Sequence, residues 1–207
     1  MPYPAHHSAE VRGKIVDSAR RLFNRYGFDN VSLDQIMSGA GLTRGGFYQY
    51  FKSKSDLYTE VLGCFFTGPD WKNGWEGIEV NLQSAHAGAQ IVQAYLSRQH
   101  FDDVENSCPM VALPTDVTRS SEDARKAFEN VFGAMVNLLE CNIAANQTGR
   151  RHRAQAIAAM CVGGMIVARA MAHRTAADEL RDGCMSVALE LGGWQKAEIQ
   201  THSVNSQ

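Results

Sequence analysis

The stretch Ser32–Phe51, SLDQIMSGAGLTRGGFYQYF, decides the fold of this chain. Ser32 followed three residues later by Gln35 forms a capping-box pattern, which predicts that a short helix begins there. Gly41 can adopt the left-handed backbone conformation that ends a helix, and Thr43 is a favourable N-cap for a second helix over residues 44–50. Two short helices across a glycine-containing turn form a helix-turn-helix, and DNA-binding versions place the second helix in the major groove.

The second helix has an unusual composition for a purely structural element. The adjacent glycines Gly45–Gly46 cost roughly 1 kcal/mol each relative to alanine in a helix interior. A recognition helix can accept that cost, because a missing side chain lets the backbone approach bases and phosphates closely. We expect Phe47 to face the core, Tyr48 and Tyr50 to reach phosphate oxygens, and Arg44 to pair bidentately with guanine. The alternative interpretation is an ordinary core hairpin with surface tyrosines.

The residues around this stretch favour the DNA-binding interpretation. The segment Ala19–Tyr58, ARRLFNRYGFDNVSLDQIMSGAGLTRGGFYQYFKSKSDLY, resembles the TetR family of bacterial transcriptional regulators. The resemblance rests on the order of a G-[FY] turn, a capped short helix, AG, [TS]-[KR]-G, Y-x-[YH]-F and K-x-x-L. It implies an all-α fold of about nine helices, with a three-helix helix-turn-helix head at residues 1–52. Helix four would join that head to a helical ligand-binding and dimerisation body at residues 53–207.

The resemblance also implies a function, a partner and a set of contacts. We expect a ligand-responsive, DNA-binding transcriptional repressor that binds a pseudo-palindromic operator as a homodimer and is released by a small effector. The homodimer would form through the last two long helices. The expected DNA-binding residues are Ser32, Thr43, Arg44, Gly45, Gly46, Tyr48, Tyr50 and Lys54, with Arg44 and the glycine backbone reading bases and the others holding phosphates.

Composition sets limits on the remaining function classes. The chain has 207 residues and a net charge of −2. Its hydrophobic fraction of 44% is typical of a folded globular protein. Residues 1–60 carry eight Lys/Arg against six Asp/Glu, and the rest carry twelve against sixteen. This weak asymmetry suits a DNA-binding head on a body that does not bind DNA. The longest apolar run, 156–168, is shorter than the ~20 residues of a membrane helix, which predicts a cytoplasmic protein.

No catalytic or metal-binding constellation stands out in the sequence. The five cysteines are widely spread without a CxxC pair, so neither a disulfide framework nor a zinc site is indicated. No cofactor is expected. A Cys-dependent enzyme using Cys108 with His100 or His152 is a remote alternative, as is a helical binding protein that does not act on DNA.

Helical periodicity and capping residues divide the rest of the chain into expected elements. Residues 1–7 are expected to form a loose arm, residues 67–80, with Trp71 and Trp75, a loop, and the tail after Trp194 a disordered end. A helix begun by Ser53 should carry Lys54 in its first turn, and Pro114 should kink the helix that follows Cys108. The expected helices are a first one from Ser8 to about Tyr26, the short motif helices, one through Phe66, Ser84–Phe101, one after Cys108, Glu122–Ala145, Ala154–His173 and Asp178–Leu191.

A second pattern lies in the body. The order YLS...H...(G/S)CP..AL....R resembles one subgroup of TetR-family regulators, in which this region borders the ligand pocket. Here Ser107 stands where that subgroup usually has glycine. The expected pocket residues are Tyr95, Cys108, Met110, Phe128, Phe132, Met135 and Met165, which indicate a hydrophobic ligand, although core residues would look the same.

Cys108 supports a sharper alternative for the effector. A thiol at a helix N-terminus can have a lowered pKa and become reactive. The resemblance adds that some family members sense electrophiles or oxidants through cysteine. Cys108 is therefore expected to be either an electrophile or redox sensor or a packed, small apolar residue.

Overall fold

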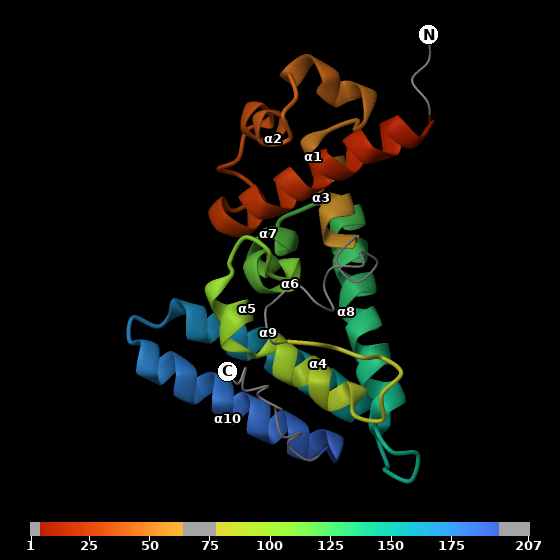
Figure 1. The fold of residues 1–207 in the computed structure, drawn as a ribbon, viewed down its shortest axis with the longest axis vertical. Helices are drawn as coiled ribbons and strands as arrows, with labels where there is room; N and C mark the ends of the chain where they lie inside the picture. Colours follow the sequence, from red (N-terminus) through yellow and green to blue (C-terminus); the bar gives the residue numbers. More distant parts are fainter. Residues whose placement is uncertain (1–4, 64–77, 195–207) are drawn as a thin grey trace, which may run out of the picture.

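The computed structural model describes residues 5–63 and 78–194, and these form helices joined by turns, without strands (Figure 1). The amino-terminal helices gather at one end of the elongated molecule, and the long carboxy-terminal helices gather at the other. The amino-terminal elements are α1 (Ala5–Tyr26), α2 (Leu33–Gly39), the 3-10 helix η1 (Arg44–Gln49) and α3 (Lys54–Gly63). The remaining elements are α4 (Ala87–Tyr95), α5 (Arg98–Asp102), α6 (Pro109–Ala112), α7 (Pro114–Thr118), α8 (Glu122–Asn142), α9 (Arg150–Ala170) and α10 (Arg174–Gly192). The predicted all-α fold is confirmed.

The head has its own apolar core. Side chains from α1, α2, η1 and α3 meet there, and Ile15, Phe23, Ile36, Phe47 and Leu57 are fully buried. The same cluster includes Leu113 at the N-cap of α7, Val117 in α7 and Ala124 in α8. Residues of the body therefore complete the head core.

The body is built around α8, α9 and α10. A second core cluster joins α4 and α6 to these long helices. Small residues allow α9 and α10 to approach closely, since a methyl group added at Gly164 would lie 2.9 Å from the Cys184 sulfur. None of the described helices is both long enough and apolar enough to cross a membrane.

Several predicted boundaries are wrong. The single helix expected over Ser84–Phe101 is two helices, α4 and α5, because the Ser97 hydroxyl caps a new helix by accepting the amide of His100 at 3.1 Å. Such a side-chain bond competes with continuation of the first helix. At Pro114 the chain does not kink a helix but begins a new one, α7, with proline in its first turn.

Helix starts also differ from the predictions. α9 begins at Arg150, directly after Gly149 in a left-handed conformation with φ +67°, and α10 begins at Arg174, in both cases four residues before the predicted start. α1 begins at Ala5, inside the expected loose arm. The predicted tail after Trp194 and most of the predicted loop, with Trp71 and Trp75, lie outside the described residues.

Candidate nucleic-acid interface

The helix-turn-helix forms as its sequence predicts, with one difference in the second helix. Ser32 accepts the amide of Gln35 at 3.2 Å, and the Gln35 side chain accepts the Ser32 amide at 2.8 Å, which completes the capping box. Gly41 ends the turn with φ +72°. The second helix, η1, is a 3-10 helix, and the Thr43 side chain makes no capping bond. The expectation that Thr43 caps a regular helix is therefore wrong, although Thr43 does hold the N-cap position.

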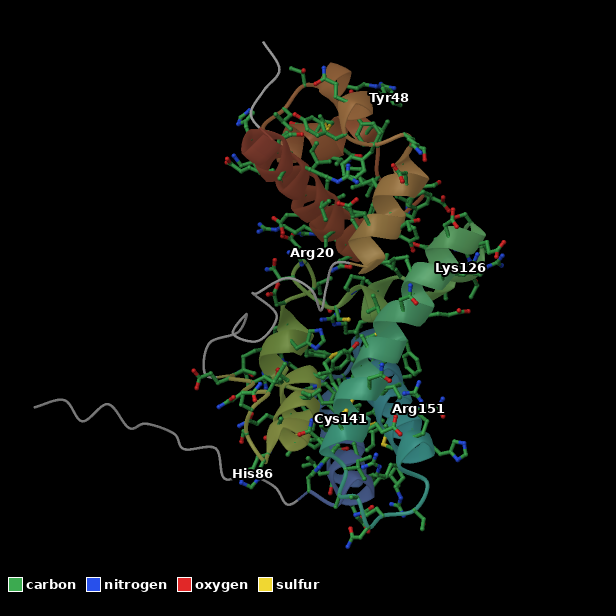
Figure 2. The ribbon with its side chains drawn as sticks, turned by 90° about the vertical axis from the view of Figure 1, so that its right-hand side faces the viewer. Arg20, Tyr48, His86, Lys126, Cys141 and Arg151 are labelled. Atoms are coloured by element: carbon green, nitrogen blue, oxygen red, sulfur yellow. The ribbon has the colours of Figure 1, made fainter. Side chains whose placement is uncertain are left out.

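The second helix buries one side and exposes the other. Phe47 is fully buried, whereas Tyr48 is 65% exposed and lies near the end of the head that is remote from the body (Figure 2). Thr43 and Gly45 are exposed, and Gly46 and Tyr50 are half-buried. This arrangement presents a hydroxyl and an open backbone to a partner that approaches the end of the molecule.

Arg44, the predicted base-reading residue, has a partner of its own in the head. Its guanidinium donates to the carboxylate of Asp34 on α2 at 2.8 Å, and both side chains are about 60% exposed. An exposed ion pair contributes little free energy, typically about 0.2–1 kcal/mol. Arg44 can therefore exchange Asp34 for a base edge at small cost.

Lys54 points inward. Its ammonium group donates to the carbonyl oxygen of Phe28 and lies 4.3 Å from the centroid of the Phe28 ring. Partial burial lowers the pKa of Lys54, and Asp29 and Asp116 nearby act in the opposite direction. Lys54 thus joins the start of α3 to the turn that follows α1. A phosphate contact would require its ammonium group to leave the Phe28 carbonyl.

Arg12 of α1 is not free to bind phosphate either. It donates to the Glu60 carboxylate at 3.0 Å and to the backbone carbonyl of Tyr50, and its guanidinium lies 4.1 Å from the centroid of the Phe51 ring. Arg12 therefore joins α1 to the end of η1 and to α3, and fixes the orientation of the second helix.

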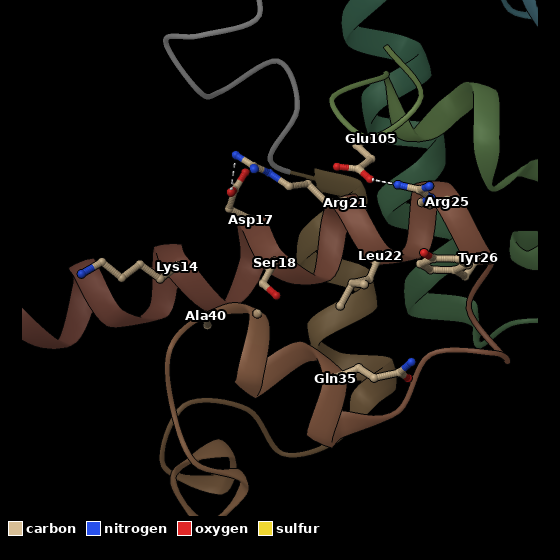
Figure 3. A pocket seen from close by; sticks show the side chains of 11 residues that line it. Lys14, Asp17, Ser18, Arg21, Leu22, Arg25, Tyr26, Gln35, Ala40 and Glu105 are labelled. Atoms are coloured by element: carbon tan, nitrogen blue, oxygen red, sulfur yellow. Dashed lines mark hydrogen bonds and ion pairs between the residues drawn. The ribbon is translucent and has the colours of Figure 1, made fainter. Parts of the chain in front are cut away.

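A groove of about 440 Å³ runs along α1 beside α2 (Figure 3). Its rim alternates charges: Arg21 pairs with Asp17, and Arg25 pairs with Glu105 of the body. Since each of these arginines has a carboxylate partner, the groove carries little net charge. It marks the place where the head meets the loop before α6.

The predicted ligand residues lie together in the body core. Tyr95, Cys108, Met110, Met135 and Met165 are buried, and Phe128 and Phe132 are half-buried against the same cluster. The structure brings the set together, and whether it binds a ligand stays a prediction. The buried Tyr95 hydroxyl has no hydrogen-bonding oxygen or nitrogen partner in the described part of the chain, and the Cys108 thiol is its neighbour.

Burial also decides the state of the Cys108 thiol. Cys108 is fully buried at the N-cap of α6, and this raises its pKa to about 12, against the smaller lowering effect of the Tyr95 hydroxyl. In this conformation Cys108 is a neutral thiol, so the helix N-terminus does not activate it. Within the described residues, no group of three His, Cys, Asp or Glu side chains could hold a metal ion.

A buried polar cluster lies beside Cys108, and its hydrogen bonds were not predicted from the sequence. His100 Nδ1 donates to the Tyr95 carbonyl at 2.6 Å, so Nε2 is an acceptor and receives the Cys108 amide at 3.3 Å and the Ser107 hydroxyl at 2.9 Å. Arg169 donates to the same hydroxyl at 2.9 Å. Burial lowers the pKa of His100 to about 3. The sequence pattern contained His100, Ser107 and Cys108, but Arg169 was seen only as the residue that ends an apolar run within α9.

Comparison with known proteins finds similar sequences for the head. Residues 15–61 match the family model described as bacterial regulatory proteins, tetR family. A segment of 52 residues is 48% identical to the HTH-type transcriptional regulator AcrR of Shigella flexneri, which is 25% of this chain and 24% of AcrR. A match over 56 residues is 32% identical to the negative transcriptional regulator IcaR of the Staphylococcus aureus biofilm operon icaADBC, and it covers 27% of this chain and 30% of IcaR. The chain thus spans less than a third of either relative's length.

The whole fold has a counterpart among solved structures. The reduced form of Escherichia coli NemR matches 87% of this chain and 96% of its own, with a TM-score of 0.68 and 18% sequence identity. At this identity the match shows a shared fold and no more. The structural similarity therefore covers both head and body, whereas the sequence similarity covers only about a quarter of the chain.

Proposed function

We propose that this chain is a TetR-family transcriptional regulator, a repressor that binds a pseudo-palindromic DNA operator as a homodimer in the cytoplasm and is released by a small effector. The observation that carries the proposal is the second helix of the helix-turn-helix. Phe47 anchors it in the core, while Tyr48 and the open glycine backbone face outward at the end of the molecule. The family-model match to the same residues supports it.

In this proposal some head residues contact phosphates and others contact bases. Ser32, Thr43, Tyr48 and Tyr50 contact phosphates and set the register, and Arg44 with Gly45 and Gly46 reads base edges after leaving Asp34. Lys54 joins the phosphate contacts only when its ammonium leaves the Phe28 carbonyl. We propose the domain boundary after residue 52, with α3 as the helix that links head and body, although Leu57 and Val61 of α3 pack in the head core.

The homodimer is proposed to form through α9 and α10. Exposed apolar side chains lie on these two helices and at the C-cap of α9, namely Val167, Val187 and Met171. A methyl group added at Gly163 or Gly183 would meet no described neighbour, so a second copy can approach closely there. Two heads on such a dimer would reach successive major grooves about one helical turn or somewhat more apart.

The test begins with selection of tight-binding duplexes from a random pool, followed by fluorescence anisotropy at several salt concentrations. Sequence-selective binding with a steep salt dependence is the expected result, because phosphate contacts release counterions. Tyr48→Phe should weaken binding to all sequences by a similar factor, and Tyr26→Phe, an exposed tyrosine at the body end of α1, should not. Absence of selective binding from the pool would count against the proposal.

The effector is proposed to be a hydrophobic compound that binds among Tyr95, Met110, Phe128, Phe132, Met135 and Met165. A second candidate is an electrophile that reacts with Cys108, and the neighbouring Tyr95 hydroxyl favours it, since that hydroxyl can donate to a carbonyl oxygen of the reagent. Reaction would require local opening, because Cys108 is buried as the neutral thiol. If Cys108→Ser still releases DNA fully when treated with a thiol-reactive electrophile, the second candidate fails.

A further inference from the structure

The loop between α5 and α6 is held by three side chains of the first head helix. Arg20 donates to the Glu105 carbonyl at 3.1 Å, and Arg25 pairs with the Glu105 carboxylate at the surface. Asn24 lies between them and donates to the Glu105 carbonyl at 3.1 Å and to the Ser107 carbonyl at 2.8 Å. Figure 2 places Arg20 at the junction of head and body. α1 is therefore fastened directly to the body, independently of α3.

The other side of this loop is fastened to the long body helices. The Ser107 hydroxyl receives Arg169 of α9 at 2.9 Å and lies 2.9 Å from His100 Nε2. Arg169 also donates to the His100 carbonyl and, at 3.3 Å, to the Phe101 carbonyl. Ser107 is fully buried. Ser107 therefore links the two parts of the molecule, because its hydroxyl binds Arg169 of α9 and its carbonyl binds Asn24 of the head.

The hydrogen-bonding groups of the buried Asn24 amide are only partly paired. Asn24 is 6% exposed, and its Oδ1 atom has no hydrogen-bonding partner among the described residues. The unpaired acceptor is unfavourable and offsets part of the stability that the two donated hydrogen bonds contribute. What the amide supplies instead is a fixed register between α1 and the two loop carbonyls. A buried polar contact of this kind specifies one arrangement more than it strengthens the fold.

We propose that Asn24 and Ser107 are positioning residues that couple α9 of the body to α1 of the DNA-binding head. This inference rests on the proposed function, since the coupling acts on DNA binding. Movement of the loop shifts α1, and Arg12 of α1 holds η1 and α3. Coupling between two sites is reciprocal, so DNA bound at the head stabilises the loop, just as disruption of the loop weakens DNA binding.

Cys108, adjacent to Ser107, allows this coupling to be measured without a known effector. The rate at which N-ethylmaleimide labels Cys108 reports how often the loop opens, because the thiol is fully buried when the loop is closed. Cys141 is exposed on α8 and serves as the internal reference in the same sample. Peptide mass spectrometry would follow both rates with and without a saturating duplex obtained by the selection described above.

In the unaltered protein, bound DNA should slow Cys108 labelling at least about fivefold, the lower end of typical allosteric couplings, and leave Cys141 unchanged. Asn24→Leu should keep DNA binding but remove most of this protection. Ser107→Ala tests the link from the body side, since it keeps the carbonyl for Asn24 and loses the hydroxyl for Arg169. It should reduce the protection as well. Arg25→Ala is the matched control, because its exposed ion pair reaches the same loop and should preserve the protection.

The outcomes separate the coupling from the proposed function. If the unaltered protein binds a duplex but Cys108 labelling does not slow, or if Asn24→Leu and Ser107→Ala both retain full protection, the coupling is refuted while the regulator proposal stands. Protection that persists in these variants would mean that DNA shields Cys108 by another route. If anisotropy detects no binding to any duplex, the proposed function fails first, and the coupling fails with it. Far-UV circular dichroism confirms that each variant is folded.

Discussion

The buried imidazole of His100 makes the stability of this protein depend on pH in a defined direction. Burial lowers its pKa in the folded protein to about 3, from an unfolded value near 6.5, and the positive charge of Arg169 acts in the same direction. Asp103 and the Tyr95 carbonyl oppose the shift. Because Nε2 already accepts the Cys108 amide, a proton on that nitrogen would break the contact.

The sign of the effect follows from proton binding. Below pH 6.5 the unfolded chain binds a proton that folded His100 refuses, so the free energy of unfolding falls as pH falls. One pKa unit corresponds to about 1.36 kcal/mol, and from pH 7.5 to pH 5 the loss amounts to about 2 kcal/mol. Above pH 7 this residue contributes no further pH dependence.

Urea unfolding at pH 7.5 and pH 5, at one protein concentration, measures the loss. Other groups also titrate in this range, so the informative quantity is the difference between the unaltered protein and His100→Asn, which has a polar side chain that does not titrate. The variant should be less stable at pH 7.5, because it loses part of the hydrogen-bond network. Its stability should nevertheless fall by about 2 kcal/mol less between the two pH values. An equal fall in both proteins would refute the argument from burial.

Four further substitutions test the head and the body packing. Asp34→Asn should raise DNA affinity up to about fivefold in anisotropy, because it removes the carboxylate that competes for Arg44, and an unchanged affinity would indicate that Arg44 does not contact DNA. Lys54→Met should lower the melting temperature but leave the salt dependence of DNA binding unchanged, whereas a phosphate contact would reduce that slope by about 1. Gly164→Ala should cost about 1–3 kcal/mol in urea unfolding, because the added methyl group lies 2.9 Å from a sulfur of α10. Gly133→Ala, on α8 with no described neighbour within 4 Å, should instead be neutral or stabilising by up to about 1 kcal/mol.

The sequence predicted the head well because its signals are local. The Ser32 capping box, the left-handed Gly41 and the buried Phe47 each depend on residues close in the chain, and all three are confirmed. The type of the second helix was mispredicted. Helix propensity and capping do not distinguish an α-helix from a 3-10 helix over six residues.

The contacts of charged side chains could not be predicted from the sequence, because their partners are distant in the chain. Lys54 finds its carbonyl 26 residues away, and Arg169 finds the Ser107 hydroxyl 62 residues away. Helical periodicity places such residues on a face of a helix but does not identify what that face meets. Ser107 looked like a small departure from a glycine pattern, yet its hydroxyl is where the contacts of α5 and α9 converge.

The two kinds of contact between head and body differ in how easily they can change. Leu113, Val117 and Ala124 are part of the head core, so separating α3 from α7 and α8 would open a close-packed apolar seam. The contacts of α1 with the loop before α6 are hydrogen bonds and an exposed ion pair, which weaken steeply with a small change of geometry and which water can replace once the loop opens. A rotation of the head about the apolar seam would therefore exchange the polar contacts first. The loop at Ser107 is consequently the place where a small change in the body can alter the position of the head.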